Sequence, residues 1–266
     1  MQHTDYQKSQ VQPESIGLFS GKMGVALYWF HCARVFPDEN YEEQAQMLFD
    51  EVQEGINSDT HFGYADGLAG IGSTLCYLFR ERFIELNCED FFADFDTYFF
   101  NQVCFAEHTD LSRDTGIIGI GYYLLNRLKD MPTCDSMTSL KLRHLLLLVQ
   151  DILFAHLGMN GYTYPFMKSE MLPESIIVDI KRFLGKMLKT GLCPELTRKA
   201  IAIIDGMGHF GQTVFAELED AYNNKNLPVF QRLMAKIAES PEESPAKKLA
   251  MLQLQDMSLP PWWELF

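Results

Sequence analysis

The 266-residue sequence has no hydrophobic run long enough to cross a bilayer, and it has few basic residues for its size. The longest uncharged apolar stretches, residues 67–79 and 116–126, fall well short of the ~18 residues or more that a membrane helix needs. There are 22 Lys and Arg residues against 36 Asp and Glu residues, a formal net charge of −14. Phosphate binding needs a basic surface. We therefore expect no membrane span and no nucleic-acid partner.

The sequence also lacks paired cysteines and a secretion signal. Its six cysteines lie singly, with no C-x-x-C pair, and the first 30 residues show no charged segment followed by an apolar one. These features indicate a cytoplasmic protein with free thiols and no disulfide framework. Four of the cysteines have apolar neighbours and are expected to be buried: Cys32, Cys76, Cys104 and Cys193.

No segment shows the long alternating pattern of a β-strand. Instead, apolar residues recur at helical spacing between polar ones. The clearest examples are 41–56, 91–103, 145–153, 176–187 and 230–237. Because 47% of the residues are hydrophobic, the chain is not a disordered one. The patterns predict an all-α protein.

A glycine motif repeats along the chain. A small or capping residue precedes a glycine, and further glycines and an uncharged apolar run follow. The leading glycines are Gly21, Gly67, Gly116 and Gly206, at intervals of 46, 49 and 90 residues, so a degenerate copy is expected near residues 158–161. Each unit of about 45 residues then holds one buried helix, which starts at the motif, and one amphipathic helix.

Two concentric layers of helices would bury the helices that start at the motif and leave one face of each amphipathic helix exposed to water. We therefore predict a two-layered α/α toroid of about five to six helical hairpins in a single domain over residues 1–266. Residues 15–218 hold the clearest repeats, and 219–266 hold C-terminal helices and an apolar tail. An open superhelical stack of the same hairpins is the alternative.

Helix capping and close packing can explain the motif without any catalytic or ligand-binding role. Ser20, Asp66, Thr115 and Asp205 are residue types that cap helix N-termini. Glycines inside the helices are destabilising, and close approach of neighbouring helices is the expected compensation.

Three segments, 17–27, 66–72 and 115–125, resemble the repeats of the lanthionine synthetase C-like family. The resemblance implies an α/α toroid. Catalytic members of that family bind zinc and cyclise dehydrated precursor peptides by adding cysteine thiols to dehydroamino acids. Their zinc ligands precede the leading glycine of late repeats, in Cys-Tyr-Gly and Cys-His-Gly sequences.

The chain departs from the family at those ligand positions. Tyr64–Asp66, Asp114–Thr115 and Ile204–Asp205 supply neither cysteine nor histidine before the corresponding glycines. A thiolate-activating zinc needs about three N or S protein ligands. We therefore expect no metal, no cofactor and no zinc-dependent cyclisation.

The remaining candidate site residues are polar groups in or before the motifs. Asp66, Asp114 and Asp205 would gather at one end of a toroid, where they could act as paired acid–base carboxylates on a sugar or simply cap helices.

His209 replaces a motif glycine and is either a base, a lone ligand or a packing residue. His61 and His108 precede motifs and are candidates for a pocket edge. Arg113 either pairs with Asp114 or contacts an anion.

The last eight residues, 259–266, are strongly apolar. They either fold back on the helices or dock a partner or a second copy through Trp262, Trp263 and Phe266.

Three functions compete. The first is a zinc-free, non-cyclising member that binds a precursor peptide or a modifying enzyme during peptide modification or export. The second is an enzyme that uses Asp66, Asp114, Asp205 or His209 on a sugar or peptide. The third is a structural or partner-binding helical protein.

Overall fold

The computed structural model describes residues 13–36, 39–85, 88–129, 136–159, 172–208 and 210–266, and no strand occurs among them. The predicted all-α class is confirmed. The elements are α1 (Lys22–Val35), α2 (Glu39–Gly55), α3 (Leu68–Arg80), α4 (Cys88–Phe105), α5 (Ile117–Lys129), α6 (Met137–His156), α7 (Glu174–Thr190), α8 (Pro194–Met207), α9 (Val214–Asn223), α10 (Leu227–Ala238), α11 (Pro245–Gln255) and the short 3₁₀ helix η2 (Trp262–Leu265). Within the described part of the chain, no helix is both long and apolar enough to cross a membrane.

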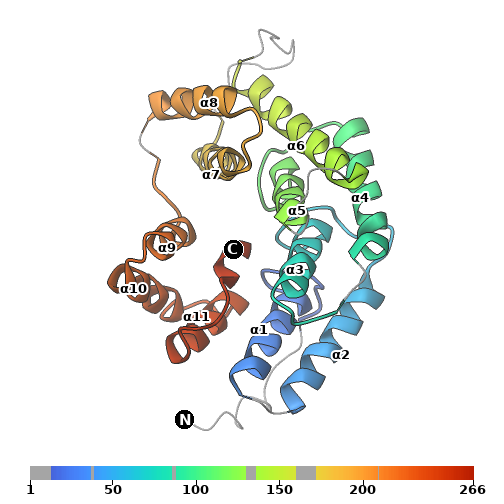
Figure 1. Ribbon diagram of the computed structural model, residues 1–266, viewed down its shortest axis with the longest axis vertical. Coiled ribbons are helices and arrows are strands. Elements are labelled where there is room, and N and C mark those ends of the chain that lie inside the picture. The colour runs from blue at the N-terminus through green and yellow to red at the C-terminus, as the bar shows by residue number, and fades with distance from the viewer. Residues whose placement is uncertain (1–12, 37–38, 86–87, 130–135, 160–171, 209) are drawn as a thin grey trace.

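Helices that alternate along the chain form an inner series. α1 contacts α3, α3 contacts α5, and α5 contacts α7, while α2, α4, α6 and α8 lie on the outside of that series (Figure 1). In Figure 1 the helices follow in chain order around the C-terminal end of the chain. The last long helix, α11, contacts the first, α1. The C-terminal end of the chain therefore lies inside this succession of helices.

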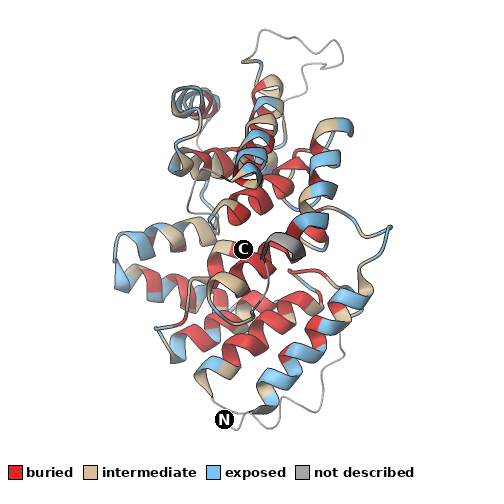
Figure 2. Ribbon diagram, turned by 45° about the vertical axis from the view of Figure 1, so that its right-hand side comes forward, coloured by how far each residue is buried: buried red, intermediate tan, exposed pale blue. Residues whose placement is uncertain are grey.

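Burial follows this division. α3 is buried from Leu68 to Leu78 and α5 from Ile117 to Arg127, all round each helix. α2 buries Ala45, Leu48 and Val52 on one face and exposes Glu42, Glu43, Asp50 and Glu54 on the others. Figure 2 shows the same contrast between the central and peripheral helices. The predicted difference between buried glycine-started helices and amphipathic helices is confirmed for these units.

A buried ion pair fixes α5 to α4. Arg127, whose side chain is fully buried, places Nη2 3.0 Å from Asp96 Oδ2. Tyr123 donates its hydroxyl to Asp96 Oδ1 at 2.6 Å, and the Arg127 guanidinium lies 4.4 Å from the centre of the Phe92 ring. The carboxylate and the ring together compensate in part for removing the guanidinium from water, while its buried Nη1 has no hydrogen-bond partner among the described residues.

The loops that precede α1, α3 and α5 repeat the same backbone geometry. We call residues 15–21, 61–67 and 110–116 the glycine loops. In each loop the first carbonyl accepts from the first helical N–H: Ser15 from Lys22 at 2.8 Å, His61 from Leu68 at 2.9 Å and Asp110 from Ile117 at 3.1 Å.

The glycine loops are also bonded to one another. The amides of Leu18 and Phe19 donate to the Ala65 carbonyl at 2.9 and 3.0 Å. The amides of Tyr64 and Ala65 donate to the Asp114 carbonyl at 2.8 and 3.1 Å. Corresponding positions thus make corresponding bonds, so the first three motifs are structural repeats.

The helix caps differ from the expectation. The N-cap residues of α1 and α3 are Gly21 and Gly67, and neither helix has a side-chain cap. Ser20 and Asp66 instead bond to each other, Oγ to Oδ1 at 3.1 Å. The capping prediction is wrong here because the loop backbone already occupies the space in front of the helix.

At the glycines inside the motifs, two kinds of neighbouring group occupy the space that a side chain would need. A Cβ on Gly70 would overlap the Tyr64 carbonyl oxygen of its own glycine loop. A Cβ on Gly72 would lie 2.7 Å from the Tyr123 ring of the next inner helix. The expected close approach is therefore present, but it involves a folded-back loop and an aromatic ring rather than two helix backbones.

The fourth motif does not start a helix. Asp205 and Gly206 lie near the C-terminal end of α8, and Gly208 follows with a φ of 155°. The fourth inner helix, α7, begins after Pro173 without a glycine motif. Of the degenerate copy, Gly158 has a φ of 72° just beyond the end of α6, and residues 160–161 lie outside the described part.

The C-terminal segment folds back into the molecule. Trp262, Trp263 and Phe266 are 0%, 1% and 4% exposed, and η2 contacts both α3 and α9. These side chains therefore pack inside their own chain, and the proposed docking role has no exposed surface here.

The cysteine predictions hold in part. Cys32 and Cys76 are buried as free thiols, Cys104 is half-buried, and Cys193 is exposed at the start of α8. The prediction is wrong for Cys193 because its apolar neighbours belong to a turn rather than to the core.

Candidate functional site

The predicted aspartates do not share a site. Asp66 and Asp114 lie in successive glycine loops, where Asp66 accepts from Ser20 and Asp114 accepts from Arg113 Nε at 3.1 Å. Asp205 lies on α8 and pairs with Lys181 of α7 at 2.6 Å. Each carboxylate thus has a different partner, and the structure does not bring the three together.

The two predicted histidines make local contacts. His61 Nδ1 accepts from the Gly63 amide at 2.9 Å, and its ring stacks on Phe62 with centroids 4.6 Å apart. His108 Nε2 lies 3.1 Å from the Val103 carbonyl oxygen. These bonds account for both residues in the loops. His209 lies outside the described residues.

Arg113 is the predicted residue that the fold places at the centre. Its amide donates to Asp179 Oδ2 of α7 at 3.0 Å, which continues the series of glycine-loop bonds onto the next inner helix. Its guanidinium lies 4.8 Å from the centre of the Phe19 ring and donates to the backbone oxygen of Phe266. Arg182 donates to that same oxygen at 3.0 Å.

Asp179 is influenced by burial and by these arginines. Burial is the largest influence and raises the pKa of Asp179, while the bond from the Arg113 amide and the positive charges of Arg113 and Arg182 oppose that rise. The aspartate therefore holds the third glycine loop in place and partly neutralises the two guanidinium groups.

A cavity of about 510 Å³ opens beside Arg113, and we call it the glycine-loop cavity. The Phe266 ring stacks on Phe19 at 5.4 Å and lies 5.8 Å from Phe215. The other charged groups on the wall are Glu242 and Glu243, from the loop between α10 and α11, and Lys236 of α10. The remaining lining residues are Ser20, Val214, Ile237, Ser240, Ser244 and Ala246.

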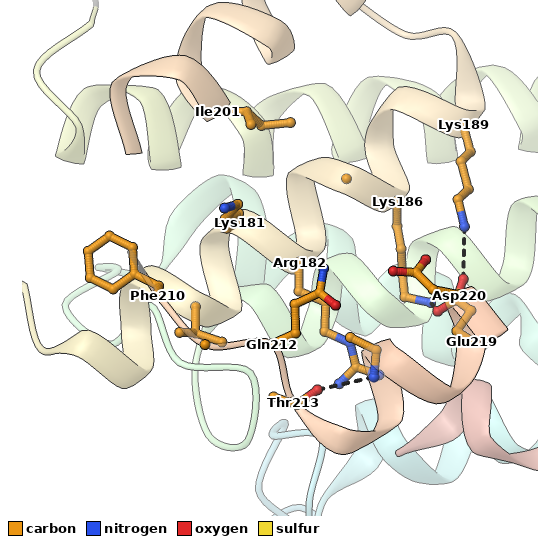
Figure 3. Close-up of a pocket in the computed structure, with 14 residues that line it drawn as sticks. Lys181, Arg182, Lys186, Lys189, Ile201, Phe210, Gln212, Thr213, Glu219 and Asp220 are labelled. Carbon is orange, nitrogen blue, oxygen red and sulfur yellow. Dashed lines mark hydrogen bonds and ion pairs between the residues drawn. The ribbon is translucent and has the colours of Figure 1, made fainter. Parts of the chain in front are cut away.

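A second hollow, the α7–α9 cleft, lies between α7 and α9, and its lining residues were not among the predicted site residues (Figure 3). It has a volume of about 360 Å³. Four basic residues of α7 line it: Lys181, Arg182, Lys186 and Lys189. The signal was present in the sequence, because four basic residues within one stretch of helix are unusual in so acidic a chain.

An ion-pair bridge crosses the cleft. Lys186 and Lys189 both lie 2.8 Å from Glu219 of α9, as Figure 3 shows. Burial raises the pKa of Glu219, but the two ammonium groups outweigh burial and lower that pKa to about 2. Beyond this bridge a further hollow of about 340 Å³ continues between α5, α6, α7 and α9.

The described residues include no group of three or more His, Cys, Asp or Glu side chains placed to hold a metal ion. Of the residues before the motif glycines, Tyr64 and Ala65 donate their amides to the Asp114 carbonyl.

Comparison with known proteins does not add an identity. The chain matches no protein-family model and no curated protein sequence.

Proposed function

We propose that this chain is a zinc-free, non-cyclising protein of the lanthionine synthetase C-like kind, which binds a basic peptide in the glycine-loop cavity. The first support is the set of three structural repeats, whose glycine loops bond to one another in the same register. With α1, α3, α5 and α7 inside and the intervening helices outside, we interpret the fold as a short α/α toroid.

One observation carries the peptide-binding proposal. A peptide segment of the chain itself, residues 262–266, already lies inside the succession of helices. Arg113 and Arg182 hold a backbone oxygen of this segment, and Phe19 stacks on its last aromatic ring. Arginine donors and aromatic faces are groups that hold a peptide backbone and an aromatic side chain in recognition sites.

The charge of the whole chain favours a basic peptide, because the cavity lining itself balances Glu242 and Glu243 with Arg113 and Lys236. Glu242 and Glu243 stand on its wall, and Glu243 is exposed beyond its pair with Lys247. The whole chain carries −14, so a basic peptide is attracted from a distance and an acidic one is repelled.

The carboxylate-enzyme alternative is less well supported. Acid–base work on a sugar needs two carboxyl groups at about 5–10 Å on either side of the substrate. Asp66, Asp114 and Asp205 are instead engaged by Ser20, Arg113 and Lys181 respectively.

Peptide binding is tested by fluorescence anisotropy with a labelled peptide, Gly-Lys-Phe-Ser-Ala-Lys-Gly. The double variant Glu242→Lys/Glu243→Lys should weaken binding at least about tenfold at low salt, because two attractive charges become repulsive. Phe215→Ala should weaken it as well, because it removes one aromatic wall.

Two controls isolate the site. Glu42→Lys/Glu43→Lys on exposed positions of α2 changes the net charge equally, and Phe105→Ala removes a ring that is 77% exposed. Both should bind within about twofold of the parent. Equal weakening by the cavity and α2 variants, or no saturable binding by the parent, would refute the proposal, and one zinc per chain by elemental analysis would refute its zinc-free part.

A further inference from the structure

The α7–α9 cleft has the size of a small-molecule site and a recessed wall. Its volume of about 360 Å³ lies in the range of ligand pockets. Gly185 stands on the α7 wall among Lys181, Arg182, Lys186 and Lys189, and a Cβ added to it would meet nothing within 4 Å. The middle of the basic face is therefore open rather than filled by a side chain.

The lining of the cleft is positive in a strongly negative molecule. Four basic side chains face two acidic ones, Glu219 and Asp220. This positive excess belongs to the lining residues; behind them, Asp205 pairs with Lys181 and the charge of Asp179 acts on Arg182. An anion in this cleft is thus attracted locally against the charge of the whole chain.

Arg182 is a further donor at the cleft. Its Nη1 donates to the backbone oxygen of Phe266, whereas its buried Nε has no hydrogen-bond partner among the described residues. The guanidinium is thus incompletely bonded within the protein, and its charge would strengthen a hydrogen bond to an oxyanion bound beside Arg182.

The start of α9 completes the wall. Gly211, Gln212 and Thr213 lead into the ten-residue helix and line the cleft together with Ala216. The N-terminal end of a helix carries a partial positive charge and attracts phosphate and carboxylate groups. Helix α9 therefore adds to the field of the α7 side chains from the opposite wall.

The other end of the cleft is apolar. Phe210 and Ile201 line it, and Figure 3 shows both at a distance from the Glu219 bridge. We propose that the α7–α9 cleft binds a small phosphate monoester, with its phosphate among Lys181, Arg182 and the start of α9 and its apolar part against Phe210 and Ile201. The lining of this site shares no residue with that of the glycine-loop cavity, although Arg182 also bonds to the Phe266 oxygen, and phosphate binding does not depend on peptide binding.

The proposal is tested by isothermal titration calorimetry with phenyl phosphate at constant ionic strength. Benzoate and benzyl alcohol serve as the carboxylate and the uncharged probes. We expect saturable binding of one phenyl phosphate per chain, weaker binding of benzoate and no binding of benzyl alcohol, because a phosphate dianion takes more donors than a carboxylate.

Two variants test the location. Gly185→Leu fills the recess of the cleft and should weaken phenyl phosphate binding at least about tenfold. Lys181→Gln removes one charge at a half-buried position and should weaken it about threefold to tenfold.

Matched controls are available on α8. Gly206→Leu adds the same side chain at an exposed helical glycine that also meets nothing within 4 Å, and Lys199→Gln removes an exposed charge outside the cleft. Both should bind within about twofold of the parent. The proposal is overturned if phenyl phosphate does not saturate, if benzoate binds as tightly, or if Gly185→Leu leaves the affinity unchanged.

Discussion

At the scale of single residues, the fold holds His31 in its neutral form. The ring is buried on α1, where Nε2 lies 3.0 Å from the Tyr77 hydroxyl of α3 and the Phe83 ring lies 4.8 Å away. Burial, followed by the positive charge of Arg34, lowers the pKa of His31 to about 3. The neutral imidazole thus belongs to the packing between two inner helices.

This burial predicts a pH dependence of stability. The unfolded chain binds the His31 proton below about pH 6.5, whereas the folded chain binds it only near pH 3. The stabilisation is therefore complete above pH 6.5 and is lost as the pH falls toward 3. Between pH 7 and pH 5 the parent should lose about 2 kcal/mol more free energy of unfolding than His31→Gln, measured by urea unfolding followed by tryptophan fluorescence. An equal loss in both proteins would contradict the prediction.

The candidate site was only partly predictable at this scale. Arg113 and Asp114 were expected to interact, and their side chains do so at 3.1 Å. That Arg113 also reaches Phe266, 153 residues away, was not predictable, because sequence spacing carries no information about contacts between distant segments. The same reason hid the pairing of Lys186 and Lys189 with Glu219.

At the scale of elements, the glycine motif specifies a loop as much as a helix. The loop folds back over the first helical turn, so the second motif glycine lies beneath a carbonyl of its own loop: Leu18 over Gly24, Tyr64 over Gly70 and Arg113 over Gly119. Where no such loop precedes the glycine, as at Gly206, the added Cβ meets nothing. This difference separates the three true repeats from the fourth motif.

Alanine substitutions at two helical glycines test this role. Gly70→Ala should reduce the free energy of unfolding by about 2–4 kcal/mol, because its methyl group overlaps the Tyr64 carbonyl and forces the loop away. Gly185→Ala on α7 should increase stability by about 0.5–1 kcal/mol, because alanine is the better helix former and the position is open. Chemical denaturation measures both, and similar values for the two variants would rule out the steric explanation.

The sequence predicted the elements better than their arrangement. The helical spacing of Phe230, Leu233, Met234 and Ile237 corresponds to the buried face of α10. The prediction that the motif at Asp205 starts a helix was wrong, because small residues and glycine also occur at helix C-termini. Periodicity alone does not distinguish the start of a helix from its end.

At the scale of the whole molecule, the C-terminal segment joins the two ends of the helical series. Trp263 packs against Tyr222 and Phe230 at centroid distances of 4.9 and 5.0 Å, and Trp262 donates Nε1 to Gln253 at 3.1 Å. Lys129 of α5 pairs with Glu264 at 2.5 Å. The segment thus contacts helices from both halves of the chain.

This packing predicts the effect of removing one ring. Trp263→Ala should reduce the free energy of unfolding by about 3–5 kcal/mol, because it leaves a cavity among buried aromatic rings. Phe105→Ala, at an exposed ring, should change it by less than about 0.5 kcal/mol. Sedimentation analysis tests the alternative. If Trp263→Ala changed the molecular mass of the protein in solution but not its stability, Trp263 would belong to an intermolecular contact instead.

The helical class and the buried character of α3 and α5 followed from the sequence, because periodicity depends on residues close together in the chain. The fold of the three glycine loops was not predicted, since the motif indicated only where helices start. The tertiary structure alone decided that α7 faces α9 across a basic cleft and that residues 262–266 lie against Arg113 and Arg182. Those pairings join segments far apart in the sequence. They are set by how the helices pack in succession, because each buried face needs a neighbour and the order of the helices determines which one it meets.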